Sequence, residues 1–207
     1  MQIKLPNSFI INGQPTQGKS YLIRSLLYQL RKEFDHGVVF SNTANVKGNY
    51  DYIPERRRYT TYDDDIIEQI IESQIELIKA NKPCRMFIIF DDMLEANFNS
   101  KTMTKLYTQY RHYNITLFTS SQYYNKLPTH VRDNGAIIFL FRTDNLKTLK
   151  KFHEEYMGEM TFNEARRYIM DRTKAKYTHL MVIKNVPDEQ KYTSGKAKQV
   201  SNFKFVF

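Results

Sequence analysis

Gly13-Gln14-Pro15-Thr16-Gln17-Gly18-Lys19-Ser20 is the stretch of sequence that decides the fold. It fills every fixed position of the phosphate-binding pattern G-x-x-x-x-G-K-[ST]. An apolar run, Phe9-Ile10-Ile11, precedes it as an expected strand, and leucines at helical spacing follow in an expected helix over Lys19–Phe34. A strand, a glycine loop and a helix in this order form a P-loop, whose backbone N–H groups and helix N-terminus attract phosphate. The stretch therefore predicts a site for a nucleoside triphosphate.

The residues of this P-loop have separate expected contacts with the nucleotide. Lys19 is expected to reach the β- and γ-phosphates, and the hydroxyl of Ser20 is expected to bind Mg²⁺. The alternative, a glycine-rich turn without a ligand, leaves the flanking strand and helix unexplained. ATP and Mg²⁺ are therefore the expected cofactors. The expected nucleotide-binding residues are the loop and the residue after it: Gly13, Gln14, Pro15, Thr16, Gln17, Gly18, Lys19, Ser20 and Tyr21.

Two neighbouring carboxylates predict the second half of this site. The apolar strand expected at Met86–Phe90 is followed by Asp91 and Asp92. Such a strand carries its last residues to the carboxyl edge of a parallel sheet, where open α/β folds bind ligands. Asp91 is the expected support for Mg²⁺, and Asp92 is the expected base that polarises the attacking water. The alternative is a helix-capping turn, which the upstream P-loop disfavours.

The spacing between the two motifs indicates a class of ATPase. Lys19 and Asp91 lie 72 positions apart (91 − 19), with an expected strand at Val38–Ser41 and an expected helix at Asp63–Lys79 between them. This spacing leaves room for an extra strand between the two nucleotide-binding strands. Such an insertion, with a carboxylate beside the metal ligand, is typical of the P-loop ATPases that include recombinases, helicases and translocases.

Strands and helices are expected to alternate along most of the chain, which predicts an α/β fold with a mainly parallel central sheet flanked by helices. We expect a RecA-like P-loop ATPase core over residues 1–142. Residues 143–207 are expected to form a small helical and β-hairpin extension packed on this core. Further expected strands are Phe9–Asn12, Ile115–Ser120, Ala136–Phe141, Tyr177–Lys184 and Asn202–Phe207; further expected helices are Lys101–Tyr110, Asn145–Tyr156 and Thr161–Thr173, and Val186–Gln199 is expected to be a mobile basic loop.

Composition and charge narrow the function classes. The formal net charge of +9 favours an anionic partner, most simply nucleic acid. The single cysteine, Cys84, excludes an internal disulfide, and no Cys/His spacing suits a metal. We expect an intracellular protein, because no apolar run approaches the length of a membrane span and the first residues are too short and polar for a signal peptide.

Two other nucleotide-binding classes fit the sequence less well. A GTPase would read guanine with Asn-Lys-x-Asp, whereas Asn125-Lys126-Leu127-Pro128 has proline in place of the carboxylate. A small-molecule kinase needs an arginine-rich lid, and Arg56-Arg57-Arg58 is the available candidate. That segment precedes the Asp91 strand, whereas most kinase lids follow it.

A third strand completes a pattern that resembles a known family. Ile115–Ser120 leads through Ser121 to Gln122, whose amide is expected to sense the γ-phosphate or the attacking water, and Arg111-His112-Tyr113-Asn114 lies just upstream. With the P-loop and the Asp91 strand, these segments are similar to the FtsK–HerA superfamily of DNA-pumping ATPases. They resemble most its viral branch, the poxvirus-type genome-packaging ATPases. The resemblance covers about residues 7 to 142.

The resemblance implies roles for single residues. Lys19 and Ser20 would hold the phosphates and Mg²⁺, Asp91 would support the metal, Asp92 would activate water and Gln122 would sense the γ-phosphate. Arg111 would be an arginine finger that acts on a neighbouring subunit's nucleotide. The alternatives for the finger are Arg132 and Arg142. The family's acidic pair is often Asp-Glu, so the Asp91-Asp92 pair makes the identity of the base less secure than that of the metal ligand.

The resemblance also implies partners. We expect a homo-oligomeric ring of five or six subunits that moves double-stranded DNA through a basic channel and docks on a capsid or portal component, with some protein associated with the virion. The alternatives are a phosphotransferase with a small-molecule acceptor and a non-motor assembly protein that uses ATP as a switch. The candidate DNA-binding residues are Lys101, Lys105, His112, Lys191, Lys196 and Lys198.

Overall fold

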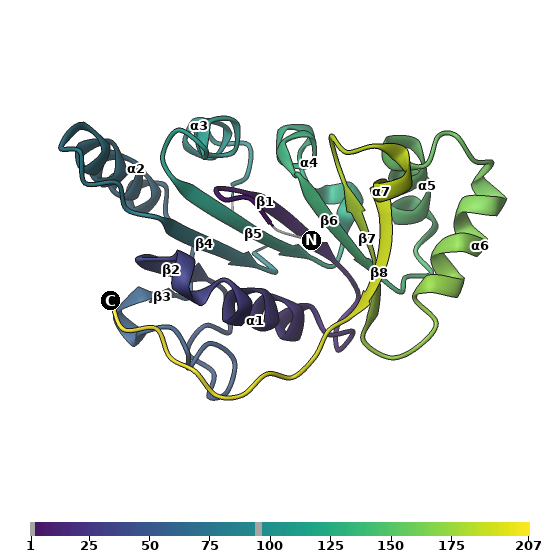
Figure 1. Ribbon diagram of the computed structural model, residues 1–207, viewed down its shortest axis with the longest axis horizontal. Coiled ribbons are helices and arrows are strands. Elements are labelled where there is room, and N and C mark those ends of the chain that lie inside the picture. The colour runs from purple at the N-terminus through teal and green to yellow at the C-terminus, as the bar shows by residue number, and fades with distance from the viewer. Residues whose placement is uncertain (1–2, 94–96) are drawn as a thin grey trace.

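A single eight-stranded sheet runs through the molecule in the order β3-β2-β4-β5-β1-β6-β7-β8 (Figure 1). The computed structural model describes residues 3–93 and 97–207, so residues 1–2 of the expected core lie outside it. The strands are β1 (Ser8–Asn12), β2 (His36–Phe40), β3 (Arg58–Tyr59), β4 (Met86–Asp91), β5 (Ile115–Ser121), β6 (Ile137–Phe141), β7 (Thr178–Ile183) and β8 (Tyr192–Lys196).

The sheet is parallel from β3 to β6, and β7 runs antiparallel to both of its neighbours. This confirms the predicted fold class. The predicted extra strand between the two nucleotide-binding strands is β5, which pairs with β1 on one side and with β4 on the other. The strand that separates them in the sequence, β2, lies beyond β4 in the sheet. The spacing therefore predicted an inserted strand. The strand that fills this place, β5, comes from later in the chain than the segment between the two motifs.

Helices and irregular segments cover the two faces of the sheet (Figure 1). Helix α1 packs on one face through a stripe that includes Leu22, Leu26 and Leu27. The other face is covered by α2 to α6, which share a second apolar cluster with the sheet. The helices are α1 (Lys19–Gln29), α2 (Asp64–Lys79), α3 (Lys101–Gln109), α4 (Thr129–Asn134), α5 (Leu146–Tyr156), α6 (Phe162–Arg172) and α7 (Asp188–Lys191).

Local sequence signals explain where several helices begin. The side chains of Asp63, Ser100 and Asn145 accept backbone N–H groups at the starts of α2, α3 and α5. Thr161 and Glu164 form a capping box at the start of α6. Helix α1 is shorter than predicted, because a 3₁₀ turn at Arg31–Glu33 replaces its expected last turn. The short elements β3 and α4 have no counterpart in the sequence prediction.

The prediction of a mobile loop over Val186–Gln199 was wrong. This segment forms α7 and then β8, which pairs with β7 from Thr178↔Lys196 to Val182↔Tyr192. The hydroxyl of Tyr192 donates to Glu159 Oε1 at 2.5 Å and so ties the strand to the turn before α6. Gly195 lies against His179, since a Cβ at this position would be 2.7 Å from the imidazole Nε2. The lysines and the glycine suggested a loop, whereas these long-range contacts make a strand.

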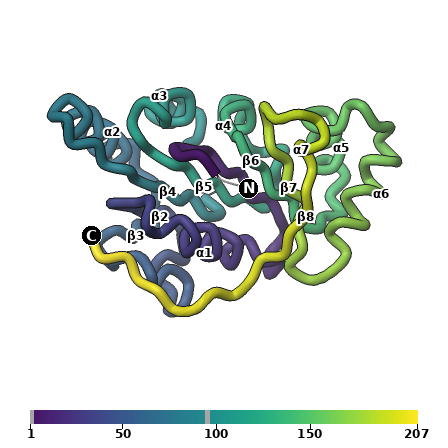
Figure 2. The backbone as a smooth tube through the Cα atoms, viewed as in Figure 1, coloured from purple at the N-terminus to yellow at the C-terminus, as the bar shows by residue number. Residues whose placement is uncertain are grey.

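The prediction of a strand at Asn202–Phe207 was also wrong. This tail leaves β8, passes alongside α1 and ends near β3 (Figure 2). It is extended, and Phe203, Phe205 and Phe207 pack on the same apolar cluster as α1. One backbone hydrogen bond, from Phe205 N–H to the Tyr52 carbonyl at 2.8 Å, joins it to the loop after β2. The alternating aromatics fit a strand, but the tail lies over a loop and a helix, where no strand edge can pair with it.

None of the helices in the described part of the chain has the length and apolar character that crossing a membrane requires.

Candidate nucleotide-binding site

The carboxyl ends of β1, β4 and β5 bring the predicted nucleotide motifs to one cavity of about 830 Å³. The P-loop follows β1, the two aspartates end β4, and Gln122 follows β5. The residues predicted to bind the nucleotide therefore gather where parallel strands end, the edge at which open α/β folds bind ligands. The cavity is lined by Pro15, Thr16, Gly18, Lys19, Ser20, Tyr21, Ser41, Asn42, Thr43, Asn49, Asp91, Asp92, Gln122 and Tyr177.

Lys19 is held across the mouth of the P-loop. Its side chain is buried, its Nζ donates to the Gly13 carbonyl at 2.9 Å, and it forms an ion pair with Asp92 Oδ2 at 3.2 Å. Gly18, at the start of α1, has a φ of 108°, a left-handed conformation that glycine adopts without steric cost. The loop therefore presents the ammonium of Lys19 and the first N–H groups of α1 to the same space.

Asp92 contacts two of the other predicted catalytic residues, Lys19 and Gln122. Its Oδ2 accepts from Gln122 Nε2 at 3.2 Å, as well as pairing with Lys19. Its Oδ1 is buried and has no hydrogen-bond partner among the described residues. An unpartnered carboxylate oxygen in a polar cavity can accept a proton or a hydrogen bond from water. The backbone of Asp92 has a φ of 50°, an uncommon conformation for a residue other than glycine.

Asp91 is buried and hydrogen-bonded to a tyrosine that the sequence did not single out. The hydroxyl of Tyr50, in the loop after β2, donates to Asp91 Oδ2 at 2.5 Å. Burial raises the pKa of Asp91, while the hydrogen bond from Tyr50 acts in the opposite direction and favours the charged carboxylate. The burial of Tyr50 also raises the pKa of its own hydroxyl, which keeps it a proton donor.

The donor set suits Mg²⁺. Ser20 places an exposed hydroxyl at the start of α1, and Asp91 supplies carboxylate oxygen at the end of β4. The described residues contain no cluster of three or more His, Cys, Asp or Glu that could hold a metal. Mg²⁺ in nucleotide sites needs no such cluster, because phosphates and water complete its oxygen shell around one or two carboxylates.

Several residues of the cavity were missed in the sequence. Ser41, Asn42 and Thr43 come directly after β2, so the rule that strand ends face the ligand could have found them. Asn49 lies further along the same loop. Tyr177, before β7, had no local signal, because β7 reaches this edge only by pairing antiparallel with β6.

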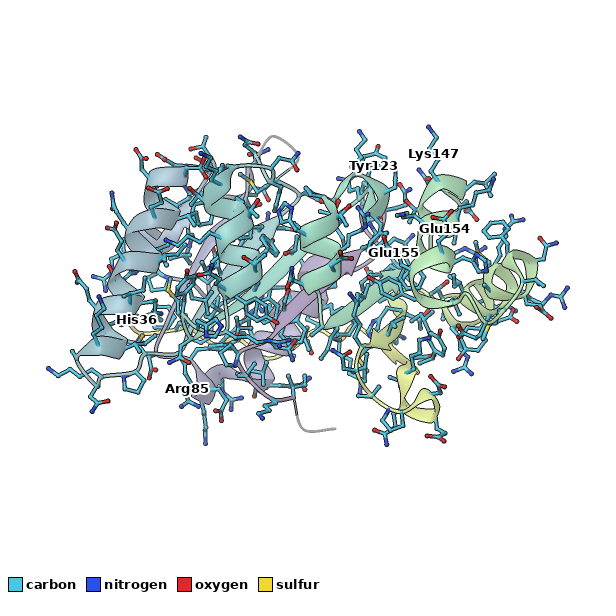
Figure 3. All side chains as sticks on the ribbon, turned by 90° about the horizontal axis from the view of Figure 1, so that it is seen from above. His36, Arg85, Tyr123, Lys147, Glu154 and Glu155 are labelled. Atoms are coloured by element: carbon cyan, nitrogen blue, oxygen red, sulfur yellow. The ribbon has the colours of Figure 1, made fainter. Side chains whose placement is uncertain are left out.

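Arg111 is not part of the cavity in its own chain. It follows α3 and precedes β5, which places it at the amino edge of the sheet, and its Nε donates to the Tyr110 hydroxyl at 3.0 Å. Figure 3 separates the two edges: His36 and Arg85, which lie at the starts of β2 and β4, are on one side and Tyr123, which follows Gln122, is on the other. The exposed Arg111 side chain therefore lies at the edge of the sheet opposite the cavity.

The alternative finger residues differ in their surroundings. Arg132 is buried, pairs with Glu155 Oε1 at 2.7 Å and donates to the Leu127 carbonyl. These contacts fasten α4 to α5, so Arg132 has a structural role that a finger could not keep. Arg142 follows β6 at the carboxyl edge and is partly exposed.

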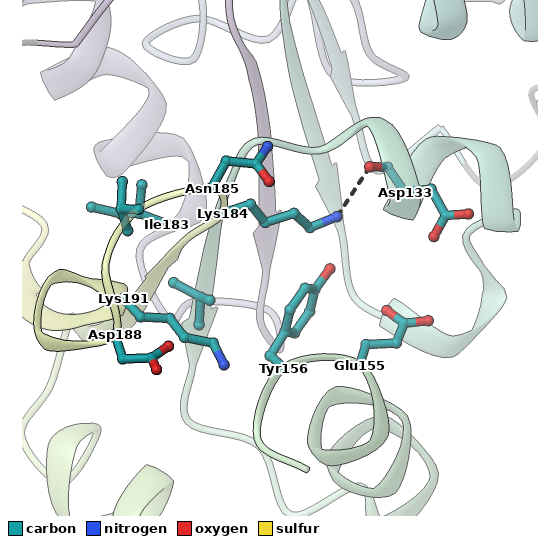
Figure 4. A pocket seen from close by; sticks show the side chains of 10 residues that line it. Asp133, Glu155, Tyr156, Ile183, Lys184, Asn185, Asp188 and Lys191 are labelled. Carbon is teal, nitrogen blue, oxygen red and sulfur yellow. Dashed lines mark hydrogen bonds between the residues drawn. The ribbon is translucent and has the colours of Figure 1, made fainter. Parts of the chain in front are cut away.

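A second cavity, of about 400 Å³, lies at the amino end of β6 (Figure 4). Its central cation is Lys184, whose Nζ donates to the carbonyls of Arg132 at 2.8 Å and Asp133 at 3.1 Å. The ammonium thus satisfies carbonyls at the end of α4. Burial lowers the pKa of Lys184. Lys184 therefore has a structural role, capping the carboxyl end of α4.

The candidate DNA-binding residues lie in three places: at α3, on α7 and at the end of β8 (Figure 1). Lys101 and Lys105 on α3 and His112 just beyond it are exposed, as are Lys196 and Lys198 at the end of β8. Lys191 on α7 forms an ion pair with Glu159 Oε1 at 3.6 Å. Lys196 and Lys198 therefore lie together at the carboxyl edge of the sheet. They do not lie beside Lys101, Lys105 and His112.

Comparisons with known sequences find a matching family and related viral proteins. The sequence model of the Poxvirus A32 protein matches residues 3–147. The chain is 29% identical over 188 residues to the uncharacterized protein 075L of Invertebrate iridescent virus 6, covering 88% of this chain and 72% of that protein. It is 30% identical over 178 residues to the uncharacterized protein 088R of Invertebrate iridescent virus 3, covering 84% and 67%.

Solved structures with the same fold are also found. The genome packaging NTPase B204 from Sulfolobus turreted icosahedral virus 2, in complex with AMPPCP, has a TM-score of 0.69 and 17% identity, covering 95% of this chain and 100% of that chain. The pCW3 conjugation coupling protein TcpA, with ATPgS, has a TM-score of 0.61 and 15% identity, covering 94% of this chain and 60% of that chain. At these identities the likeness concerns the fold.

Proposed function

The chain belongs to the Poxvirus A32 protein family, as its motifs indicated, and from this premise we propose that it is an ATPase that moves double-stranded DNA into a viral capsid. The observation that carries the proposal is the meeting of Lys19, Asp92 and Gln122 at one carboxylate oxygen, beside the P-loop. A phosphate-binding cation, a base and a sensing amide are the parts that ATP hydrolysis needs. The structural similarity to the genome packaging NTPase B204 supports the same conclusion.

Each residue has a defined task in this proposal. The P-loop N–H groups and Lys19 bind the β- and γ-phosphates and offset the charge that develops during hydrolysis. Asp92 accepts the proton of the attacking water at Oδ1, and Gln122 orients Asp92 and registers the γ-phosphate. Ser20 and Asp91 hold Mg²⁺, which neutralises charge on the phosphate oxygens.

The proposal includes a ring of subunits. Arg111 lies at the edge of the sheet opposite the nucleotide cavity, so it can assist hydrolysis only from a neighbouring copy. The net charge of +9 suits a channel for DNA phosphates, and exposed cations such as Lys105 and Lys198 are available for it. In this proposal residues 1–142 form the motor core, residues 143–207 form its extension, and a capsid or portal component is the docking partner inside the infected cell.

The steady-state ATPase rate tests the proposal directly. It is measured for the wild type and for Lys19→Ala, with and without long duplex DNA, at low and high salt. We expect a rate that needs Lys19, rises with DNA and loses its stimulation at high salt, because phosphate contacts release counterions. Lys32→Ala, which removes an exposed lysine just after α1, is the matched control and should behave as the wild type.

Two results would contradict the proposal. A rate that needs Lys19 but ignores DNA would favour a phosphotransferase or a nucleotide switch. Tight ATP binding with almost no turnover, together with no effect of Asp92→Asn, would favour the switch.

A further inference from the structure

Two tyrosines form one end of the nucleotide cavity. Tyr21 follows the P-loop serine, and Tyr177 comes from the turn between α6 and β7. Their rings meet edge to face, with centroids 5.6 Å apart and planes at 78°. Both residues line the cavity, and Tyr21 is 42% exposed. This pair is one of the edge-to-face arrangements that aromatic rings favour.

The order of strands places the polar and the aromatic lining residues of the cavity on opposite sides of β1. Asp91 ends β4 and Asp92 follows it, while Asn42 and Asn49 follow β2, so these polar groups lie on one side of the P-loop strand β1. Tyr177 precedes β7, on the other side of β1. A triphosphate whose last phosphate meets Asp92 and Gln122 must run back over the P-loop toward α1. Its nucleoside then leaves the loop where Tyr21 and Tyr177 stand.

The backbone holds Tyr177 in place for such a contact. Its φ of 66° is left-handed, a conformation that bulky residues rarely adopt. Its carbonyl accepts from the Ala197 N–H at 2.8 Å, which ties it to the end of β8. Its ring lies on the P-loop itself, since a Cβ on Gly18 would be 2.9 Å from Tyr177 Cδ1. A strained residue that is fixed by surrounding structure is a marker of function.

We propose that Tyr21 and Tyr177 form the nucleobase site, which takes a planar base by contact with the ring faces. This inference rests on the proposed function, because it assumes a nucleotide in the P-loop. The carboxamides of the cavity, Asn42, Asn49 and Gln122, come from the β2 and β5 side, away from this aromatic end. Stacking tolerates any base, since each has a π-face. The site therefore selects a nucleobase without discriminating strongly between adenine and guanine.

The exposed Lys176 lies next to the aromatic end of the cavity, although it is not one of the residues lining it. Its Nζ lies 5.0 Å from the centroid of the Tyr177 ring. A long, exposed side chain can swing away from the ring or over an incoming base at little cost. Larger stacking surfaces bind better, so purine nucleotides should bind more tightly than UTP.

The test compares ligands with and without a base. Equilibrium binding of ATP, GTP, UTP and inorganic tripolyphosphate is measured with Mg²⁺ for the wild type, Tyr21→Ala, Tyr177→Ala and Tyr177→Phe. Each alanine variant should weaken ATP binding about 10-fold and leave tripolyphosphate binding unchanged. Tyr177→Phe should keep wild-type affinity, and wild-type affinities for ATP and GTP should agree within about 10-fold.

The control is Tyr168→Ala, which removes another edge-to-face tyrosine, on α6, that is not among the residues lining the cavity. It should leave all four affinities unchanged. Equal losses for ATP and tripolyphosphate in both alanine variants would overturn the inference, because the rings would then act by shaping the P-loop. So would unchanged ATP binding, or a preference of about 100-fold for ATP over GTP. Lys19→Ala separates the two proposals: if it binds both ATP and tripolyphosphate normally, the proposed function itself fails.

Discussion

Two buried tyrosines in the loop after β2, Tyr50 and Tyr52, differ in the hydrogen bonding of their hydroxyl groups. The hydroxyl of Tyr50 donates to Asp91, whereas the hydroxyl of Tyr52 has no hydrogen-bond partner among the described residues. Their rings pack together, with centroids 5.9 Å apart. Tyr50 therefore acts through a hydrogen bond on Asp91, the proposed metal-supporting carboxylate, and Tyr52 contributes packing alone.

Tyr50→Phe should raise the Mg²⁺ concentration needed for half-maximal ATPase rate about 10-fold. Burial raises the pKa of Asp91, and loss of the Tyr50 hydrogen bond removes a group that favours its charged form. The pKa rises further, so protons compete with Mg²⁺ more strongly at low pH. The deficit should therefore be larger at pH 6.5 than at pH 8, measured by Mg²⁺ titration of the rate at both pH values.

Tyr52→Phe is the matched control for this experiment. It removes a buried hydroxyl without a partner, so the free energy of unfolding should stay the same or increase by up to about 1 kcal/mol. Its Mg²⁺ requirement should equal that of the wild type. A Tyr50→Phe protein with a wild-type Mg²⁺ requirement at both pH values would show that Tyr50 does not position Asp91.

At the scale of elements, β7 joins the C-terminal part of the chain to the ATPase sheet. Its His179 is 5% exposed and lies edge-on to Phe139 and Phe141 of β6, at 5.1 and 5.3 Å between ring centroids. Burial lowers the pKa of His179 from 6.5 to about 4. The folded state therefore keeps this imidazole neutral at pH values where the unfolded chain would protonate it.

The pH dependence of stability should report on this histidine. Between pH 6.5 and 4 the unfolded state binds the proton and the folded state does not, so stability falls as pH is lowered through this range. The contribution of neutral His179 to the free energy of unfolding is fully present above pH 6.5. About 2 kcal/mol of this contribution is lost by pH 5. His179→Leu should remove this part of the change, measured as the free energy of unfolding in urea at pH 7.5 and 5.

His112→Leu, at an exposed position beyond α3, is the control and should keep the wild-type difference between the two pH values. If His179→Leu loses as much stability between pH 7.5 and 5 as the wild type does, the neutral buried histidine is not the cause. Gly195 lies against the imidazole of His179. We expect a leucine at position 179 to fit beside Gly195, because leucine and histidine side chains have similar length.

At the scale of the whole molecule, the two edges of the sheet carry different halves of the proposed reaction. The carboxyl edge holds the nucleotide cavity, and the amino edge exposes Arg111. A single copy cannot bring them together, because the sheet separates them. Head-to-tail contact between copies would do so, and contacts of this kind close into rings when the rotation allows.

Mixing two inactive variants tests this arrangement. Arg111→Ala should bind ATP normally but hydrolyse it about 10³-fold more slowly, the effect of losing an arginine finger. Lys19→Ala should fail to bind ATP but keep its finger. Mixed assemblies should regain ATPase activity, because a Lys19→Ala subunit supplies Arg111 to a neighbour's intact nucleotide site.

The absence of recovery in these mixtures, with both variants folded and assembled, would count against action between subunits. Arg142→Ala identifies the other finger candidate in the same assay. If Arg142→Ala is the variant that loses activity and is rescued by Lys19→Ala, the finger lies at the carboxyl edge instead. Arg132 is excluded from the comparison because its substitution would break the buried ion pair with Glu155.

The sequence by itself determined the parts of this protein that depend on short-range pattern. The P-loop needs a glycine at a left-handed φ and a lysine one residue later, so the motif at Gly13–Ser20 could be recognised directly. Apolar runs followed by Asp91 and Gln122 marked β4 and β5 as strands whose carboxyl ends were predicted to face the nucleotide. These signals also predicted the family, which the match over residues 3–147 confirmed.

Only the tertiary structure decided which strands are neighbours and what the C-terminal part contributes. Strand β5 lies between β1 and β4, and β8 forms because β7 offers it an edge, although lysines and glycine suggested a loop. Tyr177 reaches the nucleotide cavity, and Tyr50 reaches Asp91 beside it, from segments far from the motifs. The physical reason is that a local pattern records which residues prefer strand, helix or phosphate. The pairing of strands and the burial of side chains depend on the free energy of the whole chain.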